Sequence, residues 1–181
     1  MSSARPATGR PLRDNPVTST LHLRCHDYVV ALTGEAALLA RLEPIFVDLA
    51  VGSASEPHVW EIEAVQAHVR LVIDDGEAGT WVNREFAASH ITAALSMAVI
   101  AAEPWRLHFH AAAVVDAGRA LLLSAPSGSG KSTLTCALVA AGARYCSDES
   151  VAVDGDGIVG YPKPISVKSS GIDTVEQLTG L

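Results

Sequence analysis

The chain has 181 residues, of which 49% are hydrophobic, and its formal net charge is −7. This length and composition predict one medium or two small domains with enough apolar residues for a core. The negative charge gives no support for nucleic acid as a partner. The three cysteines are widely spaced and lack metal-ligand spacing, which is typical of reduced thiols in a cytoplasmic protein. The most apolar segment, residues 91–102, is too short to span a bilayer, so no membrane is expected.

The N-terminal half is expected to consist of a tail and a small domain. Residues 1–18 are predicted to be a disordered tail, because residues 1–16 are polar and lack the apolar core of a secretory signal. Residues 19–104 are predicted to form a small α+β domain. Its expected elements are one or two strands within 20–31, a helix over 34–42, strands over 59–65, 68–73 and 80–82, and a helix with Asn83 as N-cap.

The pattern changes after Pro104, and residues 105–181 are predicted to form a second domain. Residues 107–115 are strand-like, residues 116–118 indicate a turn, and residues 120–124 are a short apolar run typical of a buried strand. Residues 133–141 are typical of a helix, and Gly142 stands where a left-handed C-terminal cap is expected. The order is therefore a hairpin, a glycine-rich loop and a helix.

That loop, residues 125–132, fits the phosphate-binding loop pattern, with Ala in place of the first Gly. A helix start attracts phosphate through its unpaired N–H groups and its partial positive charge. Gly128 and Gly130 let the backbone turn sharply, Lys131 is expected to reach the β- and γ-phosphates, and Ser132 is expected to hold Mg²⁺. A plain Gly/Ser turn would leave Lys131 unexplained. The predicted nucleotide-binding residues are Ser127, Gly128, Ser129, Gly130, Lys131, Ser132 and Thr133.

Two further groups of polar residues flank the loop in the sequence. His108 and His110 lie two apart on an expected strand and should share one face. Asp148 and Glu149 follow the strand-like residues 143–146. In a parallel α/β sheet, ligands gather at the carboxyl ends of strands, so this acidic pair is expected to face the loop. Adjacent carboxylates can supply a base and a metal ligand for phosphoryl transfer, although a solvated acidic turn is the alternative.

The run from Leu107-His108-Phe109-His110-Ala111 through the loop to Arg144-Tyr145-Cys146-Ser147-Asp148-Glu149 resembles the HPr serine kinase/phosphorylase family, and more closely the HPr-kinase-like proteins. The resemblance covers residues 107–170. It implies a P-loop kinase core of the type shared with phosphoenolpyruvate carboxykinase, here C-terminally incomplete because only 50 residues follow Lys131. It also implies oligomers, ATP and Mg²⁺ as donor and metal, and a serine of a protein or peptide as acceptor.

The resemblance assigns roles by position. Asp148 stands where the family has the base that takes the serine proton, and His110 where it has a histidine near the transferred phosphate. Lys131 and Ser132 match the phosphate and Mg²⁺ residues, and Glu149 replaces the family's second Asp and can assist the metal. Two features depart from the family: Thr133 follows the loop where bifunctional members carry Glu, and residues 166–169 replace a segment with a further carboxylate.

Other functions stay open at this point. A non-catalytic nucleotide-binding regulatory module derived from the same family is favoured by the short C-terminus. A motor-type P-loop ATPase is disfavoured, because the acidic pair follows a polar rather than an apolar strand. A carboxykinase is disfavoured because the sequence shows no arginine cluster for oxaloacetate.

Overall fold

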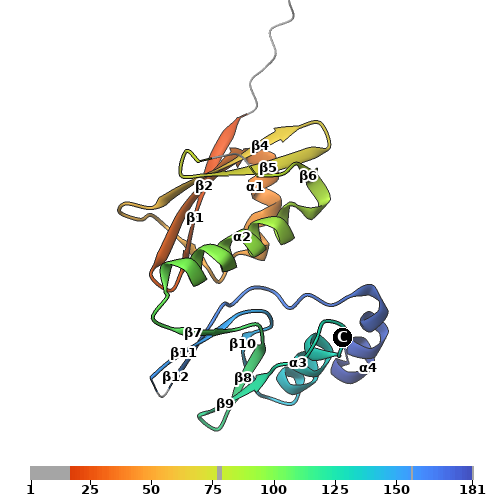
Figure 1. Cartoon of the computed structure of the whole chain (residues 1–181). Coiled ribbons are helices and arrows are strands. Elements are labelled where there is room, and N and C mark those ends of the chain that lie inside the picture. The colour runs from red at the N-terminus through yellow and green to blue at the C-terminus, as the bar shows by residue number, and fades with distance from the viewer. Residues whose placement is uncertain (1–16, 77–78, 156, 181) are drawn as a thin grey trace, which may run out of the picture.

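The computed structural model describes residues 17–76, 79–155 and 157–180, and its fold is mixed α/β with more strand than helix. Two parts follow one another along the chain (Figure 1). The first carries a six-stranded sheet, and the second carries two three-stranded sheets. The predicted tail falls on residues 1–16, which lie outside the described residues, and on residues 17–18. Its boundary was wrong by one residue, because Thr18 already pairs with Glu35 in the sheet.

The sheet of the first part has the strand order β3-β1-β2-β4-β5-β6. Its β2–β4 pair is parallel, whereas all other neighbours are antiparallel. The strands are β1 (Thr18–Cys25), β2 (Tyr28–Glu35), β3 (Ala50–Val51), β4 (His58–Val65), β5 (His68–Ile73) and β6 (Val82–Asn83). The helices are α1 (Ala36–Leu42) and α2 (Ala87–Ala102), with short 3₁₀ turns η1 (Glu43–Ile45) and η2 (Arg84–Phe86) before α2. The segment 20–31 therefore forms two strands, and the helix expected from residue 34 begins at Ala36.

Alternating side chains on β1, β2, β4 and β5 point to one face of this sheet and form the core with α1 and α2. They include Leu23, Leu32, Trp60 and Leu71. Strand alternation places every second residue on this face, and the opposite face stays accessible. Helix α2 contributes Ala87, Ile91, Leu95 and Val99, which belong to the stripe predicted from the sequence.

The segment Arg84–Ala102, which consists of η2 and α2, has the length and the apolar composition of a helix that can cross a membrane. Residues 91–102, which were expected to be too short to span a bilayer, are only part of this longer segment. In the structure the apolar stripe of α2 packs against the sheet. Only 28% of the segment is buried, because the rest of α2 faces the second part of the chain or the solvent.

The second part contains two small sheets, of order β10-β8-β9 and β12-β11-β7. Its strands are β7 (Leu107–Phe109), β8 (Ala112–Asp116), β9 (Arg119–Leu123), β10 (Arg144–Ser147), β11 (Val151–Asp154) and β12 (Gly157–Gly160). Its helices are α3 (Lys131–Ala140) and α4 (Ile172–Thr179), the latter preceded by the 3₁₀ turn η3 (Ser169–Gly171). Strands β8 and β9 form the predicted hairpin that leads into the glycine-rich loop.

Three expectations for this part were wrong. The single strand over residues 107–115 is two strands in different sheets, because the chain turns where the Ala111 N–H donates to the Phe109 carbonyl. The strand before the loop was expected to be buried, but β9 is an edge strand and Leu121 is half exposed. The neighbouring strands of this sheet are antiparallel, because β8 lies between β9 and β10.

The two parts are joined by a buried carboxylate and a buried aromatic ring. Glu103 lies 3.0 Å from His26 Nδ1 in the β1–β2 turn and 2.7 Å from the Arg106 guanidinium. His26 also contacts the Gly160 carbonyl of β12 at 3.2 Å, and Tyr161 inserts its ring into the core of the first part. Burial by itself raises the pKa of Glu103, but hydrogen bonds from Arg106 and His26 hold it below its ordinary value of 4.5.

We expect the substitution Glu103→Gln to lower the free energy of unfolding at pH 7 and to make this free energy less dependent on pH. A carboxyl whose pKa is lower in the folded state stabilises the fold above pH 4.5, and this contribution is lost as the pH falls through the folded value. The stability gap between wild type and variant should therefore narrow below pH 4.5. Urea denaturation from pH 3 to 7 measures it, with exposed Glu61→Gln as control. A gap that stays constant with pH would contradict this.

Candidate functional site

The glycine-rich loop connects the end of β9 to the start of α3. Gly128 and Gly130 have φ angles of +85° and +89°, in the left-handed region that favours glycine. A Cβ at either position would meet no atom within 4 Å, so the constraint is the backbone conformation itself. The first helical hydrogen bond runs from the Leu134 N–H to the Gly130 carbonyl, which leaves the preceding N–H groups of the helix start without intrahelical partners.

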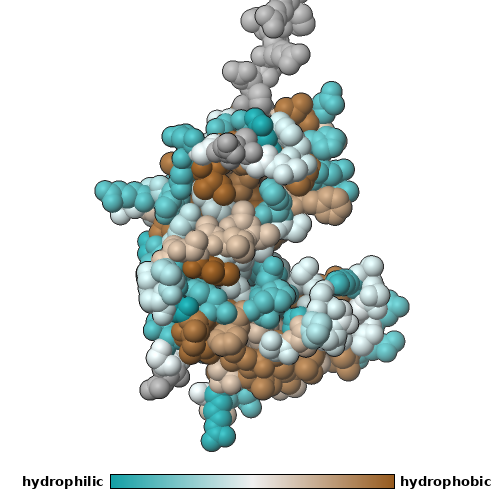
Figure 2. Space-filling view, in the orientation of Figure 1, coloured by the Kyte–Doolittle hydropathy of each residue, from teal (hydrophilic) through white to brown (hydrophobic). Residues whose placement is uncertain are grey.

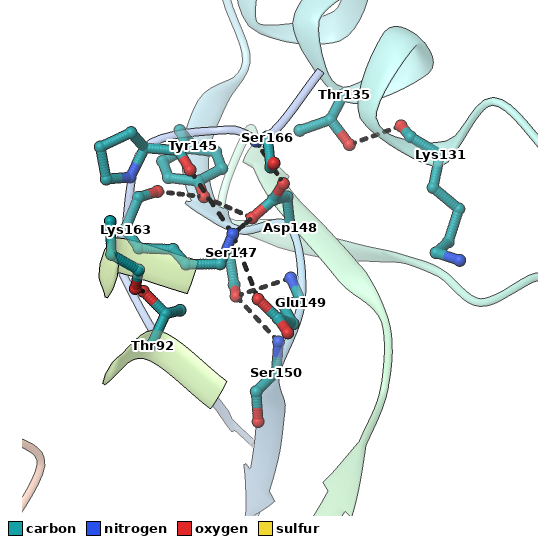
Figure 3. Close-up of polar contacts among 12 residues, drawn as sticks. Thr92, Lys131, Thr135, Tyr145, Ser147, Asp148, Glu149, Ser150, Lys163 and Ser166 are labelled. Carbon is teal, nitrogen blue, oxygen red and sulfur yellow. Dashed lines mark hydrogen bonds and ion pairs between the residues drawn. The ribbon is translucent and has the colours of Figure 1, made fainter. Parts of the chain in front are cut away.

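Lys131 begins α3, and its amine lies against the loop itself. Its Nζ donates to the Ala125 carbonyl and lies 3.3 Å from the Pro126 carbonyl. Figure 3 shows the Lys131 side chain extending away from Asp148 and Glu149. The structure therefore brings the loop and the acidic pair to one cleft but does not bring the Lys131 amine to the carboxylates.

The acidic pair directly follows β10. Because β9 and β10 both run antiparallel to β8, their carboxyl ends lie at the same edge of the sheet. The sheet is antiparallel and not parallel, but the carboxyl ends of the two strands still lie together, as predicted from the sequence. Ser147 supports the turn, since its hydroxyl accepts hydrogen bonds from the N–H groups of Glu149 and Ser150 at 3.3 and 3.2 Å.

Asp148 is buried and held by the segment that follows β12. Its Oδ1 lies 2.7 Å from Lys163 Nζ, and its Oδ2 accepts a hydrogen bond of 2.9 Å from the Ser166 N–H. Lys163 also lies 3.2 Å from Glu149 Oε2, so one ammonium group contacts both carboxylates. Figure 3 shows Lys163 and Ser166 on either side of Asp148. The site is thus a buried ion pair with a second, more exposed carboxylate.

Tyr145 on β10 completes this network. Its hydroxyl donates to the Lys163 carbonyl at 2.6 Å and lies 3.4 Å from Asp148 Oδ1. Burial raises the pKa of the Tyr145 phenol well above its ordinary value, and the charge of Asp148 raises it further. Tyr145 therefore stays protonated and acts as a hydrogen-bond donor that fixes the backbone at Lys163.

No role for Lys163 or Lys168 was predicted from the sequence. Lys168 Nζ lies 3.3 Å from the Ser127 hydroxyl, beside the loop. The chain contains only three lysines, and all three line the same cleft. This rarity of lysine was the available signal: two of the three stand within five residues of each other, downstream of the loop. In a chain of net charge −7, the cleft is a local concentration of ammonium groups.

The cleft has a volume of about 660 Å³ and lies between the two parts of the chain. Figure 2 shows the hollow between them. The loop, the acidic pair and residues 163–168 form one wall, and the first part forms the other. The residues of the first part that line it are Ile45, Glu85, Ala88, Ser89 and Thr92. The two histidines separate: His110 follows β7 and lines the cleft, while His108 Nε2 donates to the Glu103 carbonyl at 3.0 Å.

The described residues contain no group of three or more His, Cys, Asp or Glu side chains arranged to hold a metal ion. The predicted metal residues, Ser132 and Glu149, both line the cleft. Mg²⁺ is commonly bound by one or two protein oxygens together with substrate phosphates and water, so this sparse set fits that ion only with a phosphorylated ligand.

Comparisons with models of known protein families, with curated proteins and with solved structures find no match for this chain.

We expect Lys163→Met to lower the free energy of unfolding by about 3 kcal/mol, because it leaves the buried Asp148 carboxylate without its cation. The exposed control Lys168→Met should change it by less than about 0.5 kcal/mol. The double variant Asp148→Asn/Lys163→Met should be more stable than Lys163→Met alone. Urea denaturation of all four proteins measures these differences. Equal losses for the two lysine variants would show that the ion pair does not support the fold.

Proposed function

We propose that the chain is an ATP-dependent kinase that transfers the γ-phosphate of ATP to a serine hydroxyl of a protein or peptide. The observation that carries this proposal is the convergence of the loop, the acidic pair and all three lysines on one cleft. The sequence resemblance to HPr-kinase-like proteins supports the same activity. A P-loop kinase core, with the loop as its phosphate site, belongs to this proposal.

The shape and chemistry of the cleft fit a nucleotide. A volume of about 660 Å³ falls within the range of ligand pockets. The start of α3 offers N–H groups next to Gly128 and Gly130, where an anion can approach the backbone closely. Lys131 would hold the phosphates after turning from the loop carbonyls, and Lys168 adds positive charge beside Ser127.

Mg²⁺ would be held by the Ser132 hydroxyl and the Glu149 carboxylate, together with phosphate oxygens. The Glu149 side chain is about one third exposed, so it can exchange Lys163 for a cation in the cleft. The metal would neutralise charge on the phosphates, which is its usual contribution to phosphoryl transfer.

The reaction forms a bond between the serine oxygen and the γ-phosphorus and breaks the bond from that phosphorus to the β–γ bridging oxygen. ADP leaves, and the serine proton goes to Asp148. A carboxylate can accept about four hydrogen bonds, so Asp148 keeps acceptor capacity beyond its contacts with Lys163, Ser166 and the Tyr145 hydroxyl. Lys163 positions this carboxylate, and His110 at the edge of the cleft can donate a hydrogen bond to the transferred group.

A non-catalytic nucleotide-binding module is the second candidate. The observation that favours it is that Lys163 already contacts both carboxylates, while Lys131 lies against its own loop. In that module the nucleotide would change the position of residues 163–168 without chemistry. Loss or retention of phosphoryl transfer separates the two candidates.

We expect the folded protein to bind ATP-Mg²⁺ in isothermal calorimetry and Lys131→Ala to bind at least about tenfold more weakly, because a charge-assisted contact to phosphate is lost. Arg119→Ala is the matched control, since Arg119 is an exposed cation at the far end of β9. Equal weakening in both variants would indicate a non-specific charge effect. If the folded wild type binds no ATP-Mg²⁺, the cleft is not a nucleotide site.

We expect Asp148→Asn to reduce phosphoryl transfer to serine-containing peptides by about 10²–10⁴-fold while ATP affinity stays near that of the wild type. The amide keeps the size of the carboxyl group but cannot take the serine proton. Transfer is measured as labelled phosphate on a pool of serine peptides. Unchanged transfer would exclude Asp148 as the base, and ATP binding by wild type without any transfer would favour the non-catalytic module.

A further inference from the structure

A second, smaller groove of about 260 Å³ lies next to the cleft. One side is α2, and the other is β7 with the residues that follow it. Its lining consists of Ala93, Ser96, Met97, Ile100, His108, Phe109, His110, Glu149 and Ser150. His110 and Glu149 line both this groove and the main cleft, so the two hollows meet at these residues.

The walls of the groove are apolar and accessible. Met97 is 66% exposed and Phe109 is 41% exposed, and they approach from α2 and β7 respectively. Methionine side chains are flexible and adapt to different apolar partners, and an aromatic ring offers a large contact area. This end of the groove therefore suits an aliphatic or aromatic side chain.

Ser96 lines the groove, but its hydroxyl oxygen is buried and has no hydrogen-bond partner among the described residues, so it offers no contact to a ligand. The accessible polar side chains of the groove include His110, which is exposed, and Glu149, whose side chain is about one third exposed. Both lie where the groove meets the cleft. A ligand with an apolar side chain in the groove and a hydroxyl group at this junction therefore matches the lining.

We propose that this groove binds the acceptor peptide by an apolar residue within one or two positions of the phosphorylated serine. The apolar side chain packs between Met97 and Phe109, and the serine reaches the junction at His110 and Glu149. An extended chain advances about 3.3 Å per residue, so neighbouring positions suffice. This inference rests on the proposed kinase function and names its substrate class.

The test uses two synthetic peptides that are identical except that the leucines flanking the central serine of the first are aspartates in the second. Their binding is measured directly by calorimetry, with and without ATP-Mg²⁺. We expect the leucine peptide to bind at least tenfold more tightly than the aspartate peptide. Met97→Asp and Phe109→Asp should each lose this binding, whereas Val65→Asp, an exposed apolar residue outside both hollows, should keep it.

Several results would overturn the groove assignment: equal affinity for the two peptides, no binding of either, or unchanged binding by both groove variants. A concentration-dependent dimer that Met97→Asp dissolves, without peptide binding, would mean that a second copy covers the groove. ATP binding is followed separately, and it should be unchanged in the groove variants. If folded wild type binds no ATP, the kinase proposal fails, and the peptide measurement still decides what the groove binds.

Discussion

The buried ion pair between Asp148 and Lys163 fixes the path of the chain across the cleft. Lys163 follows Tyr161, whose ring lies in the core of the first part, and Asp148 also accepts a hydrogen bond from the Ser166 N–H. Removing two charges from water costs free energy, and this cost is offset only when each charge finds a well-placed partner in the fold. Here each has its partner, and residues 161–168 are held between α2 and the glycine-rich loop as a wall of the cleft.

The cleft concentrates lysines in an acidic protein, and the proposed phosphate site depends on how their charge is distributed. All three lysines line it, and two of them contact groups that a phosphate would compete with: loop carbonyls for Lys131 and a hydroxyl for Lys168. Lys163 instead contacts both carboxylates of the acidic pair and offsets part of their negative charge, which would repel phosphate. Positive charge is thus divided between ligand binding and compensation of the carboxylates.

The junction of the two parts also sets the geometry between the cleft and the smaller groove. Glu103 directly follows α2 and binds His26 and Arg106 through its carboxylate, while its carbonyl accepts a hydrogen bond from His108 of β7. These contacts fix α2 relative to β7, and the groove is the space between them. A donor site over the loop and an acceptor site in the groove would then meet at His110 and Glu149.

The features that depend on neighbouring residues were predictable from the amino-acid sequence: the β8–β9 hairpin, the stripe of α2, and the loop whose Gly128 and Gly130 adopt positive φ. Backbone sterics and side-chain periodicity act over a few residues, so a sequence displays them directly. Strand pairing and ion pairing depend on residues distant in sequence. The position of β8 between β9 and β10, the place of β7 in another sheet, and the contacts of Lys163 with the acidic pair therefore became visible only in the folded chain.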